Sequence, residues 1–192
     1  MMWDGWYSLR QSDRVLHAGA FNWTYTLGTG LMDPWAIGAT ALIPADGTDA
    51  SALPALMSAH DATIFAAVPG VYRRLLRSKM PVLPALRHGL SAGEKLPDDT
   101  RRDWEAKTGA QIHEAFGMSE CSTFISGSPL RPAPKDTLGF PQKGRHIAIL
   151  AEGKPVPHGQ AGQIAIHHDD CGLMLGYWDA PLDGDWFETG DI

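Results

Sequence analysis

A continuous apolar run at residues 62–68 sharply limits how this chain can fold. The run reads Ala-Thr-Ile-Phe-Ala-Ala-Val, and a stretch of this kind is typical of a strand that is covered on both faces. Pro69 follows it directly, and the fixed backbone angle of proline suits the first turn of a helix. A strand buried on both sides that leads at once into a helix predicts a parallel sheet with helices packed against it.

The same alternation of strand and helix extends over the first two-thirds of the chain. Apolar segments bounded by turn residues predict further strands at residues 14–17, 39–43, 86–90 and 111–116. Helices are expected over residues 52–59, from Pro69 onward, and from Pro97 to Gly109. The last of these opens with Asp98 and Asp99, which suit the positive end of a helix, and Gly109 can take the left-handed conformation that ends one.

The pattern changes after about Pro129, where several prolines mark an irregular connection. Residues 146–150 and 162–167 then alternate or run apolar on either side of a turn rich in glycine and proline, which predicts antiparallel strands of a small barrel or sandwich. The expected fold is α/β, with a largely parallel sheet and flanking helices over residues 1–130. A small antiparallel β-barrel-like part is expected over residues 131–192.

Charge and composition exclude several classes of function. The net charge of the 192 residues is −6, with no basic cluster beyond Arg73-Arg74 and Arg101-Arg102, so binding to nucleic acid phosphates is not expected. No apolar run approaches the roughly 18–20 residues of a membrane-spanning helix, so no membrane partner is expected. Cys121 and Cys171 are far apart, which disfavours a disulfide scaffold and a cysteine zinc site and favours a cytoplasmic protein.

Two loops are expected at the carboxyl ends of parallel strands, where sheets of this kind bind their ligands. They are residues 91–95, Ser-Ala-Gly-Glu-Lys, and residues 116–120, Phe-Gly-Met-Ser-Glu. The second loop combines groups suited to a nucleotide, because an aromatic ring can stack on a purine, a hydroxyl can bond a phosphate oxygen and a carboxylate can hold Mg²⁺. The residue types alone equally allow a capped turn with Phe116 in the core.

Three other patterns are weaker. Gly28-Thr29-Gly30 begins like a dinucleotide-binding loop but lacks the third glycine. Residues 117–121 approach the GxSxG nucleophile elbow with Ser119 as the nucleophile, but Cys121 replaces the last glycine. Residues 167–170, His-His-Asp-Asp, have the composition of a metal site. Consecutive strand residues point to opposite faces, however, so a solvated loop is expected there.

Several segments together resemble the AMP-forming adenylating superfamily of acyl- and aryl-CoA synthetases, luciferases and peptide-synthetase adenylation domains. Residues 116–120 resemble its aromatic-Gly-x-Thr/Ser-Glu motif, and residues 186–191, Trp-Phe-Glu-Thr-Gly-Asp, resemble its Thr-Gly-Asp motif. Residues 91–96 resemble the loop on the adenine side, and residues 162–166 and 176–181 resemble the strand and Gly-Tyr motif in between. Five segments in family order over most of the chain make the resemblance specific.

The resemblance implies a site for ATP or AMP, Mg²⁺ and CoA, together with a small-molecule carboxylate. Glu120 would be the Mg²⁺ ligand and Ser119 would contact the α-phosphate, so these are the two implied catalytic residues. Phe116 would flank the adenine, and Asp191 would hold the ribose hydroxyls. The other residues implied at the nucleotide are Gly93, Glu94, Lys95, Glu114, Ala115, Gly117 and Met118.

The segment of residues 21–30 resembles the acyl-pocket helix of CoA ligases. Trp23 and Tyr25 are therefore candidate walls of the carboxylate pocket, and their aromatic character favours aryl or medium-length acyl groups. In the family, a carboxylate attacks the α-phosphate of ATP and releases pyrophosphate, and the acyl-adenylate then passes to the thiol of CoA. Positioning and charge neutralisation, more than a nucleophilic side chain, carry such a reaction.

Some positions depart from the family pattern. Gln163 stands where glutamate is usual, Leu175 where arginine commonly precedes Gly-Tyr, and Lys95 at a common proline position. The sequence contains neither the Ser/Thr/Gly-rich phosphate loop nor the small carboxyl-terminal domain with its catalytic lysine.

We therefore expect the central-to-late part of the large domain of a CoA ligase, inactive in adenylation as a lone chain. Two alternatives stay open. One is a nucleotide- or acyl-binding module without chemistry, and the other is a structural half completed by another chain or by self-association through exposed strand edges.

Overall fold

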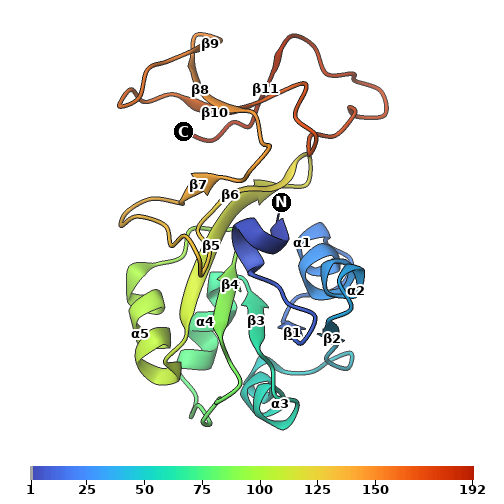
Figure 1. The fold of residues 1–192 in the computed structure, drawn as a ribbon, viewed down its shortest axis with the longest axis vertical. Coiled ribbons are helices and arrows are strands. Elements are labelled where there is room, and N and C mark those ends of the chain that lie inside the picture. The colour runs from blue at the N-terminus through green and yellow to red at the C-terminus, as the bar shows by residue number, and fades with distance from the viewer. Residues whose placement is uncertain (1) are drawn as a thin grey trace.

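Five parallel strands make up most of the larger of two sheets (Figure 1). The structure is a computed structural model and describes residues 2–192. The five strands are β1 (Arg14–His17), β2 (Thr40–Leu42), β3 (Ile64–Ala67), β4 (His88–Ser91) and β5 (Gln111–Met118). The sheet has the order β2-β1-β3-β4-β5-β6-β7, and its first five strands pair in parallel. The parallel sheet predicted from the apolar run is confirmed.

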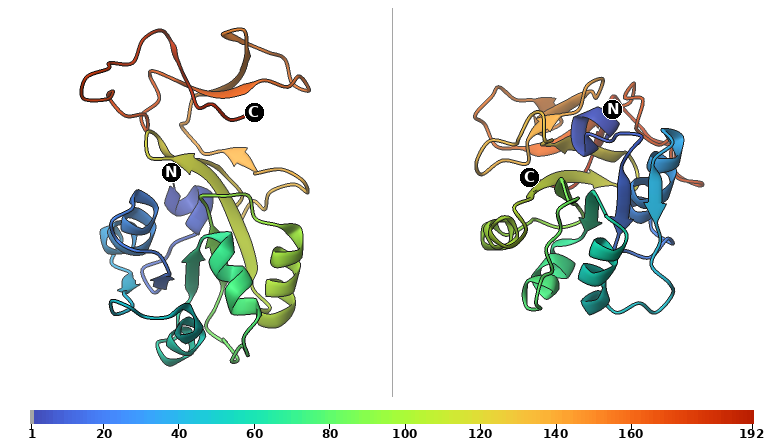
Figure 2. Two further views of the ribbon diagram at one scale, coloured as in Figure 1. Left: turned by 180° about the vertical axis from the view of Figure 1, so that it is seen from behind. Right: turned by 60° about the horizontal axis from the view of Figure 1, so that its bottom comes forward.

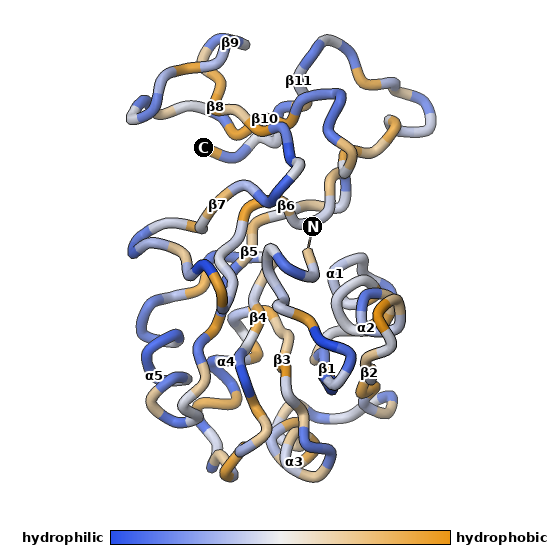
Figure 3. Tube along the Cα trace, in the orientation of Figure 1, coloured by the Kyte–Doolittle hydropathy of each residue, from blue (hydrophilic) through white to orange (hydrophobic). Residues whose placement is uncertain are grey.

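β3 lies at the centre of the core, as the run at residues 62–68 predicts. All four of its residues are buried. Phe65 and Ala67 pack with one core cluster and Ile64 and Ala66 with another, because successive strand residues point to opposite faces. Figure 3 shows the hydrophobic character of this strand against the hydrophilic tube of α5 (Asp98–Thr108).

Helices cover both faces of this sheet (Figure 2). The cluster around Phe65 takes side chains from α3 (Leu53–Ala59), α4 (Pro69–Leu76) and α5. The opposite cluster takes Trp6 and Tyr7 of η1 (Trp3–Tyr7) and Tyr25 of α1 (Thr24–Leu27). The other helical segments are η2 (Gly28–Met32), α2 (Asp33–Ala36) and η3 (Ala50–Ala52). No helix within residues 2–192 has the length and apolar character needed to span a membrane.

Element boundaries follow local hydrogen bonding more closely than hydropathy. α4 begins at Pro69, and α5 ends before Gly109, whose φ of 73° is left-handed, as predicted. β4 starts later than expected because the amide of Leu86 donates to the carbonyl of Leu83 and closes a turn. β2 starts after Ala39, whose amide donates to the carbonyl of Pro34 and belongs to the end of a helical segment.

Two antiparallel strands extend the sheet beyond β5. They are β6 (Ser122–Ser126) and β7 (Phe140–Pro141), which the sequence analysis did not predict. β6 supplies hydrogen-bonding partners as far as Met118, which pairs with Ser122. The expectation of a loop over residues 116–120 is therefore wrong in part, since the strand continues to Met118 and only then turns.

The second sheet is antiparallel throughout, as predicted from residues 146–150 and 162–167. Its order is β11-β10-β8-β9, and Figure 1 shows it above the main sheet. The strands are β8 (Ile147–Ala151), β9 (Lys154–Pro155), β10 (Gln163–His167) and β11 (Trp186–Glu188). Ile164 and Ile166 of β10 share a core cluster with Phe124 of β6, so apolar burial joins the second sheet to the hairpin.

A buried ion pair adds a polar connection between the same two parts. Arg145 Nε lies 2.8 Å from Asp170 Oδ1, and the two side chains are 2% and 0% exposed. The other guanidinium nitrogens donate to the carbonyl oxygens of Cys121 at 2.9 Å and Thr123 at 3.2 Å. Arg145 therefore ties the start of β6 to the turn that follows β10.

Asp170 is held from its other side by backbone amides. The amide of His146 donates to Oδ2 at 2.7 Å and that of Gly172 to Oδ1 at 2.8 Å. Burial alone would raise the pKa of Asp170, but these amides and the guanidinium of Arg145 outweigh it and hold the pKa below its usual value. The expectation of a solvated loop at residues 167–170 is wrong for Asp170, because its carboxylate accepts this whole network.

Removal of one partner of the pair should leave a buried charge without compensation. We expect Arg145→Met to lower the free energy of unfolding by about 3–5 kcal/mol, measured by urea denaturation at pH 7. Lys143→Met, at an exposed position nearby, is the control and should change it by less than about 0.5 kcal/mol. Equal losses in the two variants would contradict a structural role for the pair.

Candidate functional site

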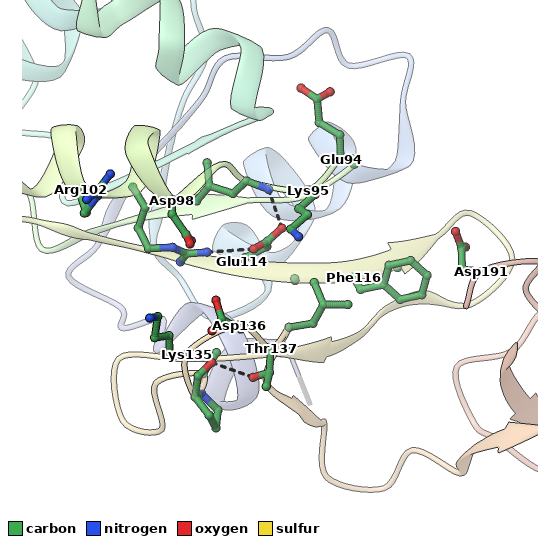
Figure 4. A pocket seen from close by; sticks show the side chains of 18 residues that line it. Glu94, Lys95, Asp98, Arg102, Glu114, Phe116, Lys135, Asp136, Thr137 and Asp191 are labelled. Carbon is green, nitrogen blue, oxygen red and sulfur yellow. Dashed lines mark hydrogen bonds and ion pairs between the residues drawn. The ribbon is translucent and has the colours of Figure 1, made fainter. Parts of the chain in front are cut away.

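A cavity of about 1020 Å³ lies at the carboxyl ends of β4 and β5 (Figure 4). Segments far apart in sequence line it, among them the loop after β4, β5 itself and Asp191 after β11. The implied nucleotide-site residues that line the cavity are Gly93, Glu94, Lys95, Glu114, Ala115, Phe116, Gly117 and Asp191. The fold therefore brings together eight positions that the sequence motifs single out.

Glu114 fastens the loop after β4 to β5. Its Oε1 accepts from the amide of Leu96 at 2.8 Å, and its Oε2 accepts from Arg101 Nη2 at 2.9 Å. Arg101 Nη1 also donates to the carbonyl of Ile112 at 2.8 Å. The Glu114 side chain is 7% exposed, and each of its carboxylate oxygens has a hydrogen-bond partner. Its role in this structure is therefore to position the loop after β4.

The neighbours of this carboxylate point elsewhere. Glu94 Oε1 accepts from the amide of Gly70 at 3.2 Å, and Figure 4 shows the Glu94 carboxylate directed away from Glu114. His113 lies on the opposite face of β5, where burial lowers its pKa to about 4. His113 is therefore a buried, neutral residue at pH 7 and supplies no charge to the cavity.

Gly117 permits the close approach of β6. A Cβ atom at this position would lie 2.4 Å from the carbonyl oxygen of Ser122 and 2.5 Å from the Cα of Thr123. The register between β5 and β6 shifts between Phe116 and Gly117. The glycine is therefore needed for the close backbone packing of β5 and β6.

Phe116 has one side in the core and one side at the cavity. Its ring packs edge-to-face on Phe124 with a centroid distance of 5.3 Å. The residue is half-buried and also lines the cavity, so part of an aromatic surface is available to a ligand. Phe116 therefore contributes to the core with one side of its ring and leaves the other side available for stacking on a base.

Asp191 reaches the cavity from the second sheet. The amide of Ile164 donates to its carbonyl at 2.8 Å, and its own amide donates to Thr189 Oγ1 at 3.2 Å. Gly190 before it has a φ of 85°, which few other residues adopt. These bonds fix the backbone on β10 and leave the Asp191 side chain exposed.

The contacts of Gln163 explain why glutamine stands here in place of the usual glutamate. With its amide oriented to satisfy both neighbours, its nitrogen donates to Glu188 Oε2 at 2.6 Å and its oxygen accepts from the amide of Gly190 at 2.7 Å. A glutamate at this position would place a second carboxylate against Glu188. The glutamine therefore suits this chain and helps to hold the segment that carries Asp191.

The end of the aromatic-Gly motif lies outside the cavity lining. Met118 packs with the cluster around Phe124, and Ser119 and Glu120 form the turn between β5 and β6. Ser119 Oγ lies 3.3 Å from Thr24 Oγ1, and Glu120 Oε1 accepts from Tyr177 Oη at 2.9 Å. The two implied catalytic residues thus sit together, beyond the residues that line the cavity.

Trp23 and Tyr25 occupy the start of α1 next to the loop after β4. A Cβ atom on Gly93 would lie 3.0 Å from a ring carbon of Trp23, so the indole borders the cavity loop. Tyr25 stacks on Trp6 at 5.8 Å, and its hydroxyl donates to the carbonyl of Leu90 at 3.3 Å. Burial raises the pKa of Tyr25, which keeps its proton. Trp23 is the more accessible of the two implied pocket walls.

Further cavity residues are not among those that the resemblance implies at the nucleotide. They are Leu96, Asp98, Arg101, Arg102, Ala133, Pro134, Lys135, Asp136, Thr137 and Leu138. The position of Arg101 in the sequence does point to a specific role. It is the fourth residue of α5, near the N-terminus of the helix, where the helix dipole disfavours a cation. A cation in that place indicates a specific carboxylate partner, which is Glu114.

The site offers one carboxylate, that of Glu120, as a ligand for Mg²⁺. Within residues 2–192, no group of three or more His, Cys, Asp and Glu side chains could enclose a metal ion. Mg²⁺ commonly takes one or two protein carboxylates and completes its shell with water and phosphate oxygens. Glu120 can supply one such carboxylate, so the residues suit an ion held mainly by a bound nucleotide.

Comparison with known proteins identifies similar chains. The family model described as "AMP-binding enzyme" matches residues 1–178. The benzoate–CoA ligase of Thauera aromatica is 30% identical over 95% of this chain. The mitochondrial acyl-coenzyme A synthetase ACSM3 of Pongo abelii is 29% identical over 97% of it. This chain spans 36% and 34% of the lengths of these two relatives.

Solved structures give the same result. A benzoate CoA ligase from Burkholderia xenovorans LB400 matches 95% of this chain with a TM-score of 0.84 and 30% identity. The anthranilate CoA ligase AuaEII, solved in complex with anthranoyl-AMP, matches 96% with a TM-score of 0.82 and 29% identity. The matched part is 39% and 37% of those chains.

Gly117→Ala tests the close contact between β5 and β6. We expect it to lower the free energy of unfolding by about 1–3 kcal/mol, because the new methyl group meets backbone atoms that cannot rotate away. Gly28→Ala is the control: Gly28 has a helical φ of −66°, and a Cβ atom there would lie 3.9 Å from Asp33 Oδ2, an ordinary van der Waals distance. That change should raise stability by about 0.5–1 kcal/mol. A neutral Gly117→Ala in thermal or urea unfolding would contradict the steric role.

Proposed function

The chain belongs to the AMP-binding enzyme family, and on that basis we propose that it carries the adenosine half of the active site of an ATP-dependent carboxylate–CoA ligase. The observation that carries the proposal is the convergence of the loop after β4, β5 and Asp191 on one cavity. Because this chain spans about a third of the length of its relatives, the reaction of the whole enzyme is part of the proposal.

The adenine ring is proposed to lie between the loop after β4 and Phe116. Gly93 has no side chain and a φ of 95°, so its peptide offers a flat backbone surface on one side. Phe116 offers an aromatic face on the other, and such rings stack favourably on bases. Asp191, exposed at the same cavity, would accept hydrogen bonds from the ribose hydroxyls. Glu114 keeps its structural bonds and holds the loop in place.

The proposed reaction has two steps. A carboxylate oxygen of the acid bonds to the α-phosphorus of ATP as the bond to pyrophosphate breaks, and this gives the acyl-adenylate. The sulfur of CoA then bonds to the acyl carbon, and AMP leaves with the electron pair of the broken bond.

Two side chains of this chain would assist the first step. The hydroxyl of Ser119 would donate to an oxygen of the α-phosphate, and the carboxylate of Glu120 would hold Mg²⁺. When bound, Mg²⁺ neutralises phosphate charge. Both contributions are positional and electrostatic, because this displacement needs no protein nucleophile.

The carboxylic acid is proposed to be aryl or medium-chain. Trp23 borders the loop at Gly93 and is 40% exposed, so its indole is available as an aromatic wall. Two matched proteins are named for aromatic acids, benzoate and anthranilate. An aromatic wall and aromatic substrates suit each other, because offset or edge-to-face ring pairs add to the burial of apolar area.

Asp191→Asn tests the nucleotide site directly. Calorimetry with AMP in the presence of EDTA should show binding by the wild-type chain. The variant should bind about tenfold more weakly, because a charged acceptor of the ribose hydroxyls is lost. Asp183→Asn changes an exposed carboxylate just before β11, outside the cavity lining, and this variant should bind like the wild type. Absence of AMP binding, or equal losses in both variants, would refute the proposed site.

We further propose that these 192 residues alone do not form acyl-adenylate at a meaningful rate. These 192 residues span about a third of the length of their relatives and do not include the phosphate-loop and catalytic-lysine segments that the family resemblance implies for adenylation. Incubation with ATP, Mg²⁺ and a panel of aryl and medium-chain acids should release no pyrophosphate above background. The benzoate–CoA ligase of Thauera aromatica with benzoate serves as the positive control. Robust release by this chain would contradict the proposal.

A further inference from the structure

Tyr177 contacts the carboxylate that is proposed to hold Mg²⁺. Its hydroxyl donates to Glu120 Oε1 at 2.9 Å. The Tyr177 side chain is 51% exposed, so burial does not force the hydroxyl to find a protein partner. Water could serve instead, and the bond to Glu120 therefore depends on how the backbone places the two side chains.

The backbone around Tyr177 is fixed on the turn that carries Glu120. We call residues 171–181 the strap. Met174 in the strap donates its amide to the carbonyl of Glu120 at 2.7 Å. The amide of Tyr177 donates to the carbonyl of Ala180 at 3.1 Å, and Gly176 forms a β-bridge with Pro181. Glu120 is thus held by the strap at its backbone and at its side chain.

The strap begins at the buried ion pair. The amide of Gly172 donates to Asp170, and a Cβ atom on Gly172 would lie 2.7 Å from Arg145 Cζ. Arg145 at the same time donates to the carbonyls of Cys121 and Thr123, which lie one and three residues after Glu120 in the chain. One buried arginine therefore sets the start of the strap against the turn that the strap covers.

We propose that Tyr177 is a positioning residue for the metal ligand Glu120. Its hydroxyl holds Oε1 and leaves Oε2 as the oxygen available to Mg²⁺. This inference rests on the proposed function, because it assigns a role toward an ion that the nucleotide would bring.

Hydrogen bonds to a ligating carboxylate normally strengthen metal binding. They orient the ligand, and loss of such a partner typically weakens metal affinity by about 10–100-fold. Glutamate also has more rotamer freedom to lose than most residues, so an orienting contact at an otherwise solvated turn reduces the entropy lost when the ion binds. Removal of the Tyr177 hydroxyl should therefore weaken metal binding, although Tyr177 need not touch the ion.

Tyr177→Phe removes the hydroxyl and little else. We expect its affinity for Mn²⁺, measured by electron paramagnetic resonance at saturating ATP, to fall about tenfold relative to the wild type. AMP binding in EDTA should be unchanged. In the metal-free chain, the ¹³C resonance of the Glu120 carboxyl carbon should shift. Trp178→Phe is the control: the neighbouring strap residue is fully exposed, and neither readout should move.

A second variant separates this role from general destabilisation. With Glu120→Gln as background, Tyr177→Phe should cause no further loss of Mn²⁺ affinity, because the two side chains act through one bond. A further loss of the same size in the double variant would overturn the inference. In Tyr177→Phe alone, an unchanged ¹³C resonance would overturn it, and so would Mn²⁺ binding that is unchanged or tighter. Failure of the wild-type chain to bind AMP in EDTA would overturn the proposed function as well, so the two failures are distinguishable.

Discussion

β5 pairs in two different ways, and the placement of the site depends on it. Along its first half β5 lies parallel to β4, with Glu114 opposite Ser91, and along its second half it lies antiparallel to β6. Glu114 and Phe116 are two residues apart, so the pleat directs both to the same face, where the cavity lies. The change of partner is possible because Gly117 lets the backbone of β6 approach closely. Without this pairing, the strand would end before the residues that resemble the nucleotide motif.

Two ion pairs hold the loops around this strand. Arg101 and Glu114 tie the loop after β4 to β5, and Arg145 and Asp170 tie the strap and the second sheet to the start of β6. Buried pairs add little net stability, because desolvation offsets their attraction, and their contribution is mainly geometric. Both pairs also hold backbone groups, since each arginine donates to at least one carbonyl and each carboxylate accepts at least one amide. These four charged residues thus act at the junctions between elements.

Hydropathy and turn chemistry were sufficient to predict the parallel part of the fold. The run at residues 62–68, Pro69 and Gly109 act locally, so their consequences can be derived from neighbouring residues alone. The β5–β6 hairpin could not be derived in this way, because β6 is short and the end of β5 is set by its partner. The motifs identified eight cavity residues, whereas the partners of Arg101 and Tyr177 depend on packing between segments 13 and 57 residues apart. Long-range polar contacts of this kind leave no periodic signal in a sequence.

A preformed adenosine site at the end of β4 and β5 is the central claim, and an AMP titration followed by amide chemical shifts tests it most directly. The largest changes are predicted for Gly93, Leu96, Phe116 and Asp191, which come from three separate segments and meet at one cavity. The amides of β8 and β9, outside that cavity, should stay constant. Changes clustered elsewhere, such as in the smaller groove beside Arg131, or no changes at all, would contradict the claim.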